Sequence, residues 1–408
     1  MNIKLLKSKI ENDKTLVISG SKSESNRLLI LQELFSSLTI DNVSDSDDVC
    51  AMQHALASIE NVVDIHHAGT TMRFLTAYYS LCSTRELVLT GSSRMQERPI
   101  GILVEALRQL GADIEYDKKE GYPPLRIKGK IVEGGKVELP ADVSSQYITA
   151  LLLVGTKLKK GIELHLVGNI TSRPYIEMTL QLLNQLGVES TFEGNIISVK
   201  PLMKVNTKQF TVESDWSSAS YFYSFVALSP IGTTIKLKSY KQDSLQGDSY
   251  VNELYTTLGV ETTYLADYTL ELKKVRETAP VFKADLIETP DLAQTIAVTC
   301  FGLGIKCEMT GLHTLKIKET DRLVALENEL TKLGGKVEIT DESMVIYPTE
   351  GMNEGVEIST YQDHRMAMAF APLVLKGDIE ISEAEVVTKS FINYWDCLAQ
   401  IGVNMAKK

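Results

Sequence analysis

Cysteine is scarce in this sequence, and its cysteines are not spaced for structural bonding. The five cysteines are odd in number and scattered, and they form neither a CxxC pair nor a cluster with histidine. A CxxC pair or a Cys/His cluster is the usual sequence sign of a zinc site, and an even set of cysteines in a small secreted chain is the usual sign of a disulfide framework. We therefore expect no disulfide, no metal ion and a cytoplasmic location.

Long hydrophobic runs are also missing. The longest, at residues 148–155 and 296–305, are far shorter than the ~20 apolar residues that a membrane-spanning helix needs. Residues 1–14 contain no apolar core of the kind that defines a signal peptide. We expect neither a membrane partner nor a secretion signal.

Basic residues are outnumbered by acidic ones. The 408 residues include 42 Lys and Arg against 53 Asp and Glu, which gives a net charge of −11. Nucleic-acid binding relies on a basic surface, so no nucleic-acid partner is expected. A local cluster of Lys and Arg could still bind a small anion. The length, with 44% hydrophobic and 23% charged residues, is typical of a globular protein with two or three domains.

One pattern recurs along the chain: an amphipathic helix that ends in Leu-Gly or Ile-Gly, followed by an alternating strand. A glycine directly after a helix suits a left-handed C-cap. The five glycines are separated by 76, 72, 75 and 68 residues, so the period is about 70 residues. They are Gly111, Gly187, Gly259, Gly334 and Gly402.

Each repeat is predicted to contain a strand, a loop, a helix and two further strands, and six such units would fill the chain. We expect an α/β (α+β) fold of two domains with three units each, in which helices pack against sheets. The boundary falls near residues 213–215. It separates one domain at 21–213 from another at 1–20 plus 214–408, which the strand-like first residues would close.

The loops before the helices carry most of the candidate binding residues. Helix N-termini offer free amides and the positive end of the helix dipole, and equivalent loops of a repeat can converge. With Lys and Arg, they would form a cleft for phosphate and carboxylate groups. Taken singly, each residue could equally be a helix cap or a solvated charge. The candidates are Lys22, Arg27, Arg94, Arg98, Ser144, Ser145, Gln146, Ser172, Arg173, Lys318, Arg322, Arg365 and Lys389.

Several carboxylates and one histidine are candidates for acid–base chemistry. Asp291 follows Pro290 and opens an apolar segment, so it could be a helix N-cap or a catalytic carboxylate. Glu319 stands between Lys318 and Arg322, where it could be a solvated charge or a carboxyl group held among cations. The full set is Asp291, Glu319, Asp321, Asp363 and His364.

Six motifs stand in order along the chain. They are GSKSESNR at 20–27, AGTTMR at 68–73, RMQERPIG at 94–101, SSQ at 144–146, KETDR at 318–322 and DHRMAM at 363–368. Together they resemble the 5-enolpyruvylshikimate-3-phosphate synthase (3-phosphoshikimate 1-carboxyvinyltransferase) family. The resemblance implies the enolpyruvyl transferase fold, with two domains of three βαβαββ units and the active site in the cleft between them.

The resemblance also implies a reaction. The enolpyruvyl group of phosphoenolpyruvate would pass to the 5-hydroxyl of shikimate 3-phosphate, with release of phosphate, on the pathway to chorismate and the aromatic amino acids. No cofactor is implied. These two small molecules would be the partners, and we expect a monomer. Members of the family are targets of glyphosate, which competes for the phosphoenolpyruvate site.

The family's residue roles carry over to the matching positions. Asp291 would take the proton of the attacking hydroxyl, Glu319 would protonate the methylene carbon, and Lys22 would share the proton transfer. Contacts to shikimate 3-phosphate would come from Lys22, Ser23, Arg27, Ser144, Ser145, Gln146, Ser172, Tyr175, Asp291 and Lys318. Contacts to phosphoenolpyruvate would come from Lys22, Gly69, Arg98, Gln146, Arg322, Arg365 and Lys389.

Some positions depart from the family pattern. His67 stands where the family usually has Asn, Phe74 where many members have Pro, and Thr314 where a substrate-binding Asn is common. One alternative of the same fold is UDP-N-acetylglucosamine enolpyruvyl transferase, but the cysteine of its mobile loop is missing from residues 91–101. The other alternative is a non-catalytic anion-binding scaffold.

Overall fold

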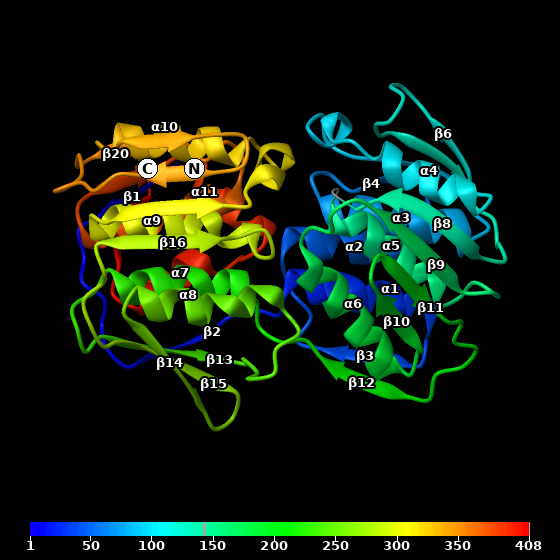
Figure 1. The fold of residues 1–408 in the computed structure, drawn as a ribbon, viewed down its shortest axis with the longest axis horizontal. Helices are drawn as coiled ribbons and strands as arrows, with labels where there is room; N and C mark the ends of the chain where they lie inside the picture. Colours follow the sequence, from blue (N-terminus) through cyan, green and yellow to red (C-terminus); the bar gives the residue numbers. More distant parts are fainter. Residues whose placement is uncertain (142–143, 408) are drawn as a thin grey trace. The chain divides into compact units, whose positions relative to one another are not determined.

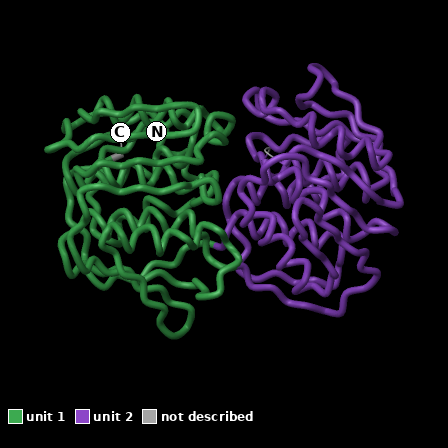
Figure 2. The backbone as a smooth tube through the Cα atoms, in the orientation of Figure 1, with its two compact units in different colours: residues 1–19, 213–408 green, residues 20–212 purple. Residues whose placement is uncertain are grey.

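The computed structural model describes residues 1–141 and 144–407. The chain divides into two compact units, which Figure 2 shows in different colours. Unit 1 is formed by residues 1–19 and 213–408, and unit 2 by residues 20–212. Lys408, the last residue of the second predicted domain, lies outside the described residues.

Within its described residues, unit 2 contains two four-stranded sheets and a parallel strand pair. In each four-stranded sheet, two parallel strands are followed by two antiparallel ones. In sheet order the strands are β4 (Val62–Asp64), β5 (Glu86–Thr90), β7 (Leu125–Lys128) and β6 (Asp113–Tyr116); β8 (Gly135–Pro140), β9 (Ile162–Val167), β11 (Ile196–Val199) and β10 (Ser190–Glu193); and β3 (Leu38–Asp41) with β12 (Lys208–Thr211). The α-helices are α1 (Lys22–Leu34), α2 (Asp47–Ala57), α3 (Gly69–Leu81), α4 (Gly101–Gln109), α5 (Ser145–Gly155) and α6 (Arg173–Leu186).

Unit 1 repeats this sheet layout three times among its described residues. In sheet order its strands are β2 (Lys14–Val17), β13 (Thr234–Lys238), β15 (Thr269–Lys274) and β14 (Val260–Leu265); β16 (Val281–Asp285), β17 (Lys306–Thr310), β19 (Met344–Ile346) and β18 (Val337–Ile339); and β20 (Val356–Ile358), β21 (Ile379–Ile381), β1 (Ile3–Leu6) and β22 (Asn404–Lys407). The α-helices are α7 (Trp216–Ala227), α8 (Val251–Thr257), α9 (Ala293–Leu303), α10 (Arg322–Lys332), α11 (His364–Phe370) and α12 (Tyr394–Gln400).

Two early strands complete sheets whose other strands come much later in the chain. β1 lies between β21 and β22, with Leu5 opposite Ile379 and Met405. β2 pairs in parallel with β13, with Leu16 opposite Leu237. Because side chains alternate between the two faces of a strand, these registers direct Leu5 and Leu16 into the core, where both are fully buried.

Three helices are buried on nearly all sides at the centre of each unit. They are α1, α3 and α5 in unit 2, and α7, α9 and α11 in unit 1, and the members of each set contact one another (Figure 1). A helix that is apolar around its whole circumference, such as α5 or α9, is stable only when protein surrounds it. The two longest apolar runs of the sequence belong to α5 and α9, and no helix among the described residues is long and apolar enough to cross a membrane.

The repeat glycines adopt the backbone conformation that the sequence predicts. Their φ angles lie between 83° and 99°, in the left-handed region where a side chain is disfavoured. The glycines are Gly111, Gly187, Gly259, Gly334 and Gly402. The predicted α/β fold, with helices packed against the sheets of repeated units, is confirmed.

Predicted site residues lie at the N-terminal ends of the central helices. In unit 2, Lys22 opens α1 and Gly69 opens α3. In unit 1, Asp291 lies in the 3-10 turn η3 (Pro290–Leu292) directly before α9, and Arg365 is the second residue of α11. The free N–H groups and the positive dipole ends at these positions favour anions.

Candidate active site

A buried arginine links three carboxylates in unit 1. Arg322, the first residue of α10, is only 2% exposed. Its Nε donates to Oδ2 of Asp363 at 2.7 Å, its Nη1 to Oδ1 of Asp291 at 2.9 Å, and its Nη2 to Oε2 of Glu319 at 2.9 Å. Charge-assisted bonds of this length fix the plane of a guanidinium group. The structure thus brings Asp291, Glu319 and Arg322 together.

Asp291 faces two further cations. Nη2 of Arg365 donates to its Oδ2 at 3.0 Å, and Nζ of Lys318 lies 3.5 Å from its Oδ1. Burial alone would raise the pKa of Asp291, but Arg365, Lys318 and Arg322 outweigh burial and hold this pKa well below its usual value. The Asp291 side chain nevertheless keeps 19% exposure. It is therefore an ionised carboxylate whose charge is balanced by protein cations.

Glu319 connects Lys389 to the same cluster. Its Oε1 lies 3.8 Å from Nζ of Lys389, while its Oε2 accepts the bond from Arg322. Lys389 ends the 3-10 segment η6 (Ala384–Lys389) and is buried. A buried ammonium group stays charged at least cost when an anion lies close to it. Glu319 supplies that anion from a distant part of the chain.

The other acid–base candidates have structural partners. Asp363 is fully buried, and its Oδ1 caps α11 by accepting from the backbone N–H of Arg365 at 2.9 Å. His364 lies beside it, with Nδ1 3.5 Å from the same oxygen. Asp321 caps α10 by accepting from the first backbone N–H groups of that helix. Asp363 and Asp321 thus hold the helix ends that carry Arg365 and Arg322.

In unit 2, Lys22 pairs with an aspartate that the sequence did not indicate. Its Nζ lies 3.3 Å from Oδ2 of Asp48, which belongs to α2 and is 2% exposed. Nε2 of His67, one of the departures from the family pattern, lies 4.0 Å from the other oxygen of Asp48. Asp48 stands in an acidic stretch, DSDD at 45–48, which by composition is typical of a solvated surface. Only the tertiary structure reveals its role beside Lys22.

Gly69 lies directly against Arg98. A Cβ atom added to Gly69 would be 2.7 Å from Nη1 of Arg98, closer than real Cβ contacts allow. Arg73 holds this arrangement, because its Nη1 donates to the Gly69 carbonyl and its Nη2 to the Pro99 carbonyl, both at 3.1 Å. The Tyr147 hydroxyl donates to the Pro99 carbonyl as well, at 2.6 Å. The loop that carries Arg98 is therefore anchored at the next residue.

Arg27 is enclosed by protein and is 3% exposed. Its Nε donates to Oγ1 of Thr179 at 2.9 Å, its Nη1 to the Ser23 carbonyl at 2.8 Å, and its Nη2 to the Tyr175 carbonyl at 3.0 Å. Burial lowers its pKa to about 10. These bonds join the start of α1 to the start of α6, so Arg27 positions two other predicted residues, Ser23 and Tyr175.

Arg94 precedes the short 3-10 turn at Met95–Glu97, and its Nη1 donates to Oε2 of Glu97 at 3.0 Å. The other remaining candidates of unit 2 lie at the starts of α5 and α6. Ser144 caps α5, because its Oγ accepts from the backbone N–H of Gln146 at 3.4 Å, and Ser145 is the first residue of that helix. Nε2 of Gln146 donates to Oγ1 of Thr70 at 3.1 Å, which ties α5 to α3. Ser172 precedes α6 in a left-handed conformation, with φ of 51°. Such strain persists only where the surroundings hold it.

The other two departures from the family pattern lie in different units. Phe74 is buried in α3, and its ring centroid lies 5.8 Å from the guanidinium carbon of Arg27. Thr314 lies in the 3-10 segment η4 (His313–Ile317) of unit 1. Its Oγ1 is enclosed without a hydrogen-bond partner among the described residues. Phe74, which directly follows the motif at 68–73, thus packs against a predicted site residue.

Ser217 and Asp248, which form a chain of hydrogen bonds to Arg365, were not indicated by the sequence. Oγ of Ser217, on α7, accepts from Nη2 of Arg365 at 3.3 Å and donates to Oδ2 of Asp248. Neither residue belongs to the six motifs. Ser217 follows a capping aspartate, and Asp248 lies in a short turn, so both are typical of ordinary loop residues in sequence.

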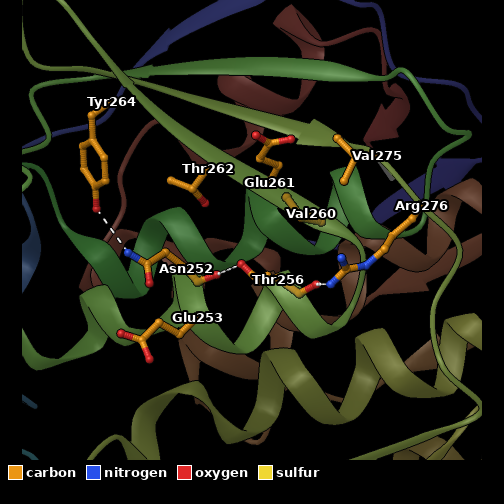
Figure 3. A pocket seen from close by; sticks show the side chains of 9 residues that line it. All are labelled: Asn252, Glu253, Thr256, Val260, Glu261, Thr262, Tyr264, Val275 and Arg276. Atoms are coloured by element: carbon orange, nitrogen blue, oxygen red, sulfur yellow. Dashed lines mark hydrogen bonds between the residues drawn. The ribbon is translucent and has the colours of Figure 1, made fainter.

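A separate pocket of about 390 Å³ lies in unit 1, between α8 and the β14–β15 hairpin (Figure 3). Its charged side chains are Glu253, Glu261 and Arg276, and Nη2 of Arg276 donates to the Thr256 carbonyl at 2.6 Å. None of the predicted site residues lines it. Over residues 1–141 and 144–407, the structure has no group of three or more His, Cys, Asp or Glu side chains placed to hold a metal ion.

Comparisons with known proteins agree on one family. The family model described as EPSP synthase (3-phosphoshikimate 1-carboxyvinyltransferase) matches residues 57–398. A 3-phosphoshikimate 1-carboxyvinyltransferase from Bacteroides fragilis is 46% identical over 394 residues, which cover 95% of each chain. Another of that name, from Vibrio vulnificus, is 35% identical over 416 residues, covering 94% of this chain and 95% of its own.

A solved structure supports the same conclusion for the fold. An EPSP synthase from Acinetobacter baumannii aligns over 100% of both chains with a TM-score of 0.79, at 21% identity. The sequence matches span nearly the whole chain and include the motifs whose side chains form the Arg322 cluster. This chain therefore belongs to the EPSP synthase (3-phosphoshikimate 1-carboxyvinyltransferase) family.

Proposed function

We propose that this protein is a transferase that moves the enolpyruvyl group of phosphoenolpyruvate to the 5-hydroxyl of shikimate 3-phosphate and releases phosphate. The reaction is a step of the shikimate pathway to chorismate and the aromatic amino acids. Membership of the family supports the reaction class. The observation that carries the proposal is that Asp291 and Glu319 both bind the buried Arg322, which places two ionisable groups among cations.

The cations suit the charge of the substrates, since each substrate carries a phosphate and a carboxylate. Side chains from both units take part. We assign phosphoenolpyruvate to Lys22, Gly69, Arg98, Gln146, Arg322, Arg365 and Lys389. We assign shikimate 3-phosphate to Lys22, Ser23, Arg27, Ser144, Ser145, Gln146, Ser172, Tyr175, Asp291 and Lys318. Lys and Arg would neutralise the anions and orient them for reaction.

The acid–base roles follow from the charges of the reacting atoms. Once the substrate anions engage Arg322 and Lys389, Glu319 takes up a proton and gives it to C3 of phosphoenolpyruvate, and C2 gains cationic character. The 5-hydroxyl oxygen then bonds to C2 while Asp291 takes its proton, which yields a tetrahedral phospho-ketal. Glu319, now a carboxylate, takes a proton back from C3, which re-forms the double bond as the C2–oxygen bond to phosphate breaks, and the proton held by Asp291 passes to the leaving phosphate. Lys22 shares the proton transfers, and the cations stabilise the leaving phosphate.

The low pKa of Asp291 has a consequence for this mechanism. A carboxylate whose charge is stabilised by Arg365, Lys318 and Arg322 is a weak base. Binding of phosphate and carboxylate groups to these cations would offset part of their charge, and the pKa of Asp291 would rise. Asp291 would therefore become a competent base only when both substrates are present.

Phosphate release tests the proposed function. We expect release only when phosphoenolpyruvate and shikimate 3-phosphate are both present, with one enolpyruvyl ether formed per phosphate, as detected by mass spectrometry. Release with UDP-N-acetylglucosamine as the acceptor would instead indicate the related transferase. Binding of both substrates without turnover would indicate a non-catalytic scaffold.

We further propose that units 1 and 2 act as the two domains of a cytoplasmic monomer, with the active site in a cleft to which both contribute. The candidate residues come from both units, which supports an active site to which both contribute. The five cysteines are all free thiols, which supports the cytoplasmic location. Light scattering during gel filtration should give the mass of one chain. A mass of two chains at micromolar concentration would contradict the monomer.

A further inference from the structure

Asp248 is a buried carboxylate that has no part in the mechanism described so far. It lies in the 3-10 turn η2 (Gly247–Tyr250) and is 3% exposed. Gln246, two residues before Asp248, ties this turn to the start of α7, because its Nε2 donates to the Ser214 carbonyl at 2.9 Å. Asp248 is therefore held at a defined place beside α7, where Ser217 donates to its Oδ2.

Ser217 connects Asp248 to the proposed base. Its Oγ accepts from Nη2 of Arg365 at 3.3 Å, and the same Nη2 donates to Oδ2 of Asp291 at 3.0 Å. A serine hydroxyl has one proton to donate and two lone pairs to accept with. An ionised Asp248 can only accept, so it directs the Ser217 proton toward itself and leaves the oxygen lone pairs for Arg365.

We propose that Asp248 is a positioning residue, which acts through Ser217 to hold the guanidinium group of Arg365 in the orientation needed to bind phosphoenolpyruvate and to face Asp291. This inference rests on the proposed function, in which Arg365 contacts phosphoenolpyruvate and Asp291 is the base. Four separate elements supply the chain of contacts: η2, α7, α11 and η3.

The charge state of Asp248 makes the proposal testable by pH. Burial raises the pKa of Asp248, the negative charges of Asp291 and Asp215 raise it further, Arg365 and the hydrogen bond from Ser217 lower it, and the result is about 6. Asp291, Asp215 and Arg365, before α9, at the start of α7 and on α11, are the charged groups that act on it from the surrounding elements. The anchoring of Ser217 should therefore strengthen as pH rises through about 6.

The test compares Asp248→Asn with the parent enzyme in kcat/KM for phosphoenolpyruvate, from about pH 5 to about pH 8. Asp243→Asn, an exposed aspartate five residues earlier, is the matched control. The phosphates of both substrates also titrate near pH 6, and the ratio of variant to parent cancels that effect. At the high-pH end we expect Asp248→Asn to lower kcat/KM about ten- to hundredfold, mainly through a higher KM, as for a lost hydrogen bond to a charged group.

At the low-pH end the ratio of kcat/KM for Asp248→Asn to that for the parent should approach one, because the parent's own Asp248 is then protonated. In a double-mutant cycle at high pH, Asp248→Asn should have little further effect in a Ser217→Ala background. A ratio that does not change with pH, or additive effects in the cycle, would overturn the proposal. If Asp248→Asn does not fold, Ser217→Ala alone must show the same pH-dependent loss, and a flat ratio would overturn the proposal equally.

The two levels of inference fail in different ways. An inactive parent enzyme overturns the proposed function, and the positioning role falls with it. An active parent whose Asp248→Asn variant matches Asp243→Asn at every pH overturns only the positioning role.

Discussion

At the scale of single residues, Asp291 carries a negative charge that protein cations stabilise in a mostly enclosed position. Asn keeps the shape of this side chain but cannot accept a proton at neutral pH. We expect Asp291→Asn to lower kcat by about 10²–10⁴-fold, the usual contribution of a general acid–base group. Phosphate release with both substrates is the measurement, with Asp243→Asn as the control. Near-normal turnover in a folded variant would remove Asp291 from the mechanism.

The close contact between Gly69 and Arg98 leads to a second prediction at the scale of single residues. The methyl group of Gly69→Ala would displace the guanidinium end of Arg98, a flexible group that can shift. We expect a raised KM for phosphoenolpyruvate in a stable protein. Because glyphosate is longer than phosphoenolpyruvate, its inhibition constant should rise by a larger factor. Inhibition titrations on parent and variant at equal stability decide this, and equal constants would rule out the packing argument.

Asp248 should also make folding stability depend on pH. Its folded-state pKa of about 6 lies above the usual aspartate value. Its contribution is therefore fully present below the unfolded-state pKa of about 4, and is lost as pH rises through about 6. As pH rises from about 4 to about 6, the unfolding free energy of Asp248→Asn should increase relative to that of the parent by up to roughly 3 kcal/mol, since one pKa unit corresponds to about 1.4 kcal/mol. Urea unfolding of both proteins at several pH values measures this difference in unfolding free energy. A difference that does not change with pH would contradict the prediction.

Residue identity predicted some parts of the candidate site better than others. Lys22 and Glu319 could be selected because they stand inside recognisable motifs. Asp48 and Asp248 could not, since each matters only through the side chain that packs against it. Such a contact depends on how two distant segments pack, and neither residue type nor spacing records that packing.

At the scale of elements, the glycines that end the repeat helices allow a stability test. Gly187 has φ of +99°, and an added Cβ atom would meet nothing within 4 Å, so the cost of Gly187→Ala is backbone strain alone. We expect a loss of about 1–2 kcal/mol in unfolding free energy and unchanged turnover. Gly187→Asn should cost less, because Asn tolerates this conformation. Gly351→Ala, with open space and no left-handed backbone, should be neutral.

The repeat made the helix that ends at each repeat glycine and the strand after it predictable, but not every helix or every helix boundary. The sequence predicts that Asp291 opens the helix that follows it. In the structure, Asp291 lies in the 3-10 turn η3, and α9 begins two residues later. Pro290 explains the difference, because it fixes its own φ and lacks an N–H group. The tighter turn directs Asp291 toward Arg322 and Arg365.

At the scale of the whole molecule, the proposed substrate contacts come from both units. Clusters of Lys and Arg repel one another unless anions lie between them. We expect the radius of gyration, measured by X-ray scattering, to fall when phosphoenolpyruvate and shikimate 3-phosphate are both bound. Inorganic phosphate at equal ionic strength is the control. An unchanged radius at saturation with both substrates would argue against closure around them.

The pairing of β1 between β21 and β22 has a consequence for biosynthesis. Residues 20–212 leave the ribosome as one continuous stretch, so unit 2 can complete its sheets while translation continues. β1 emerges earlier than any of unit 2, yet its partners are synthesised at the far end of the chain. During that interval its edges stay unpaired and open to wrong partners. β1 is thus made before every strand of unit 2 but pairs after them, and its sheet in unit 1 is complete only after the ribosome has passed β22.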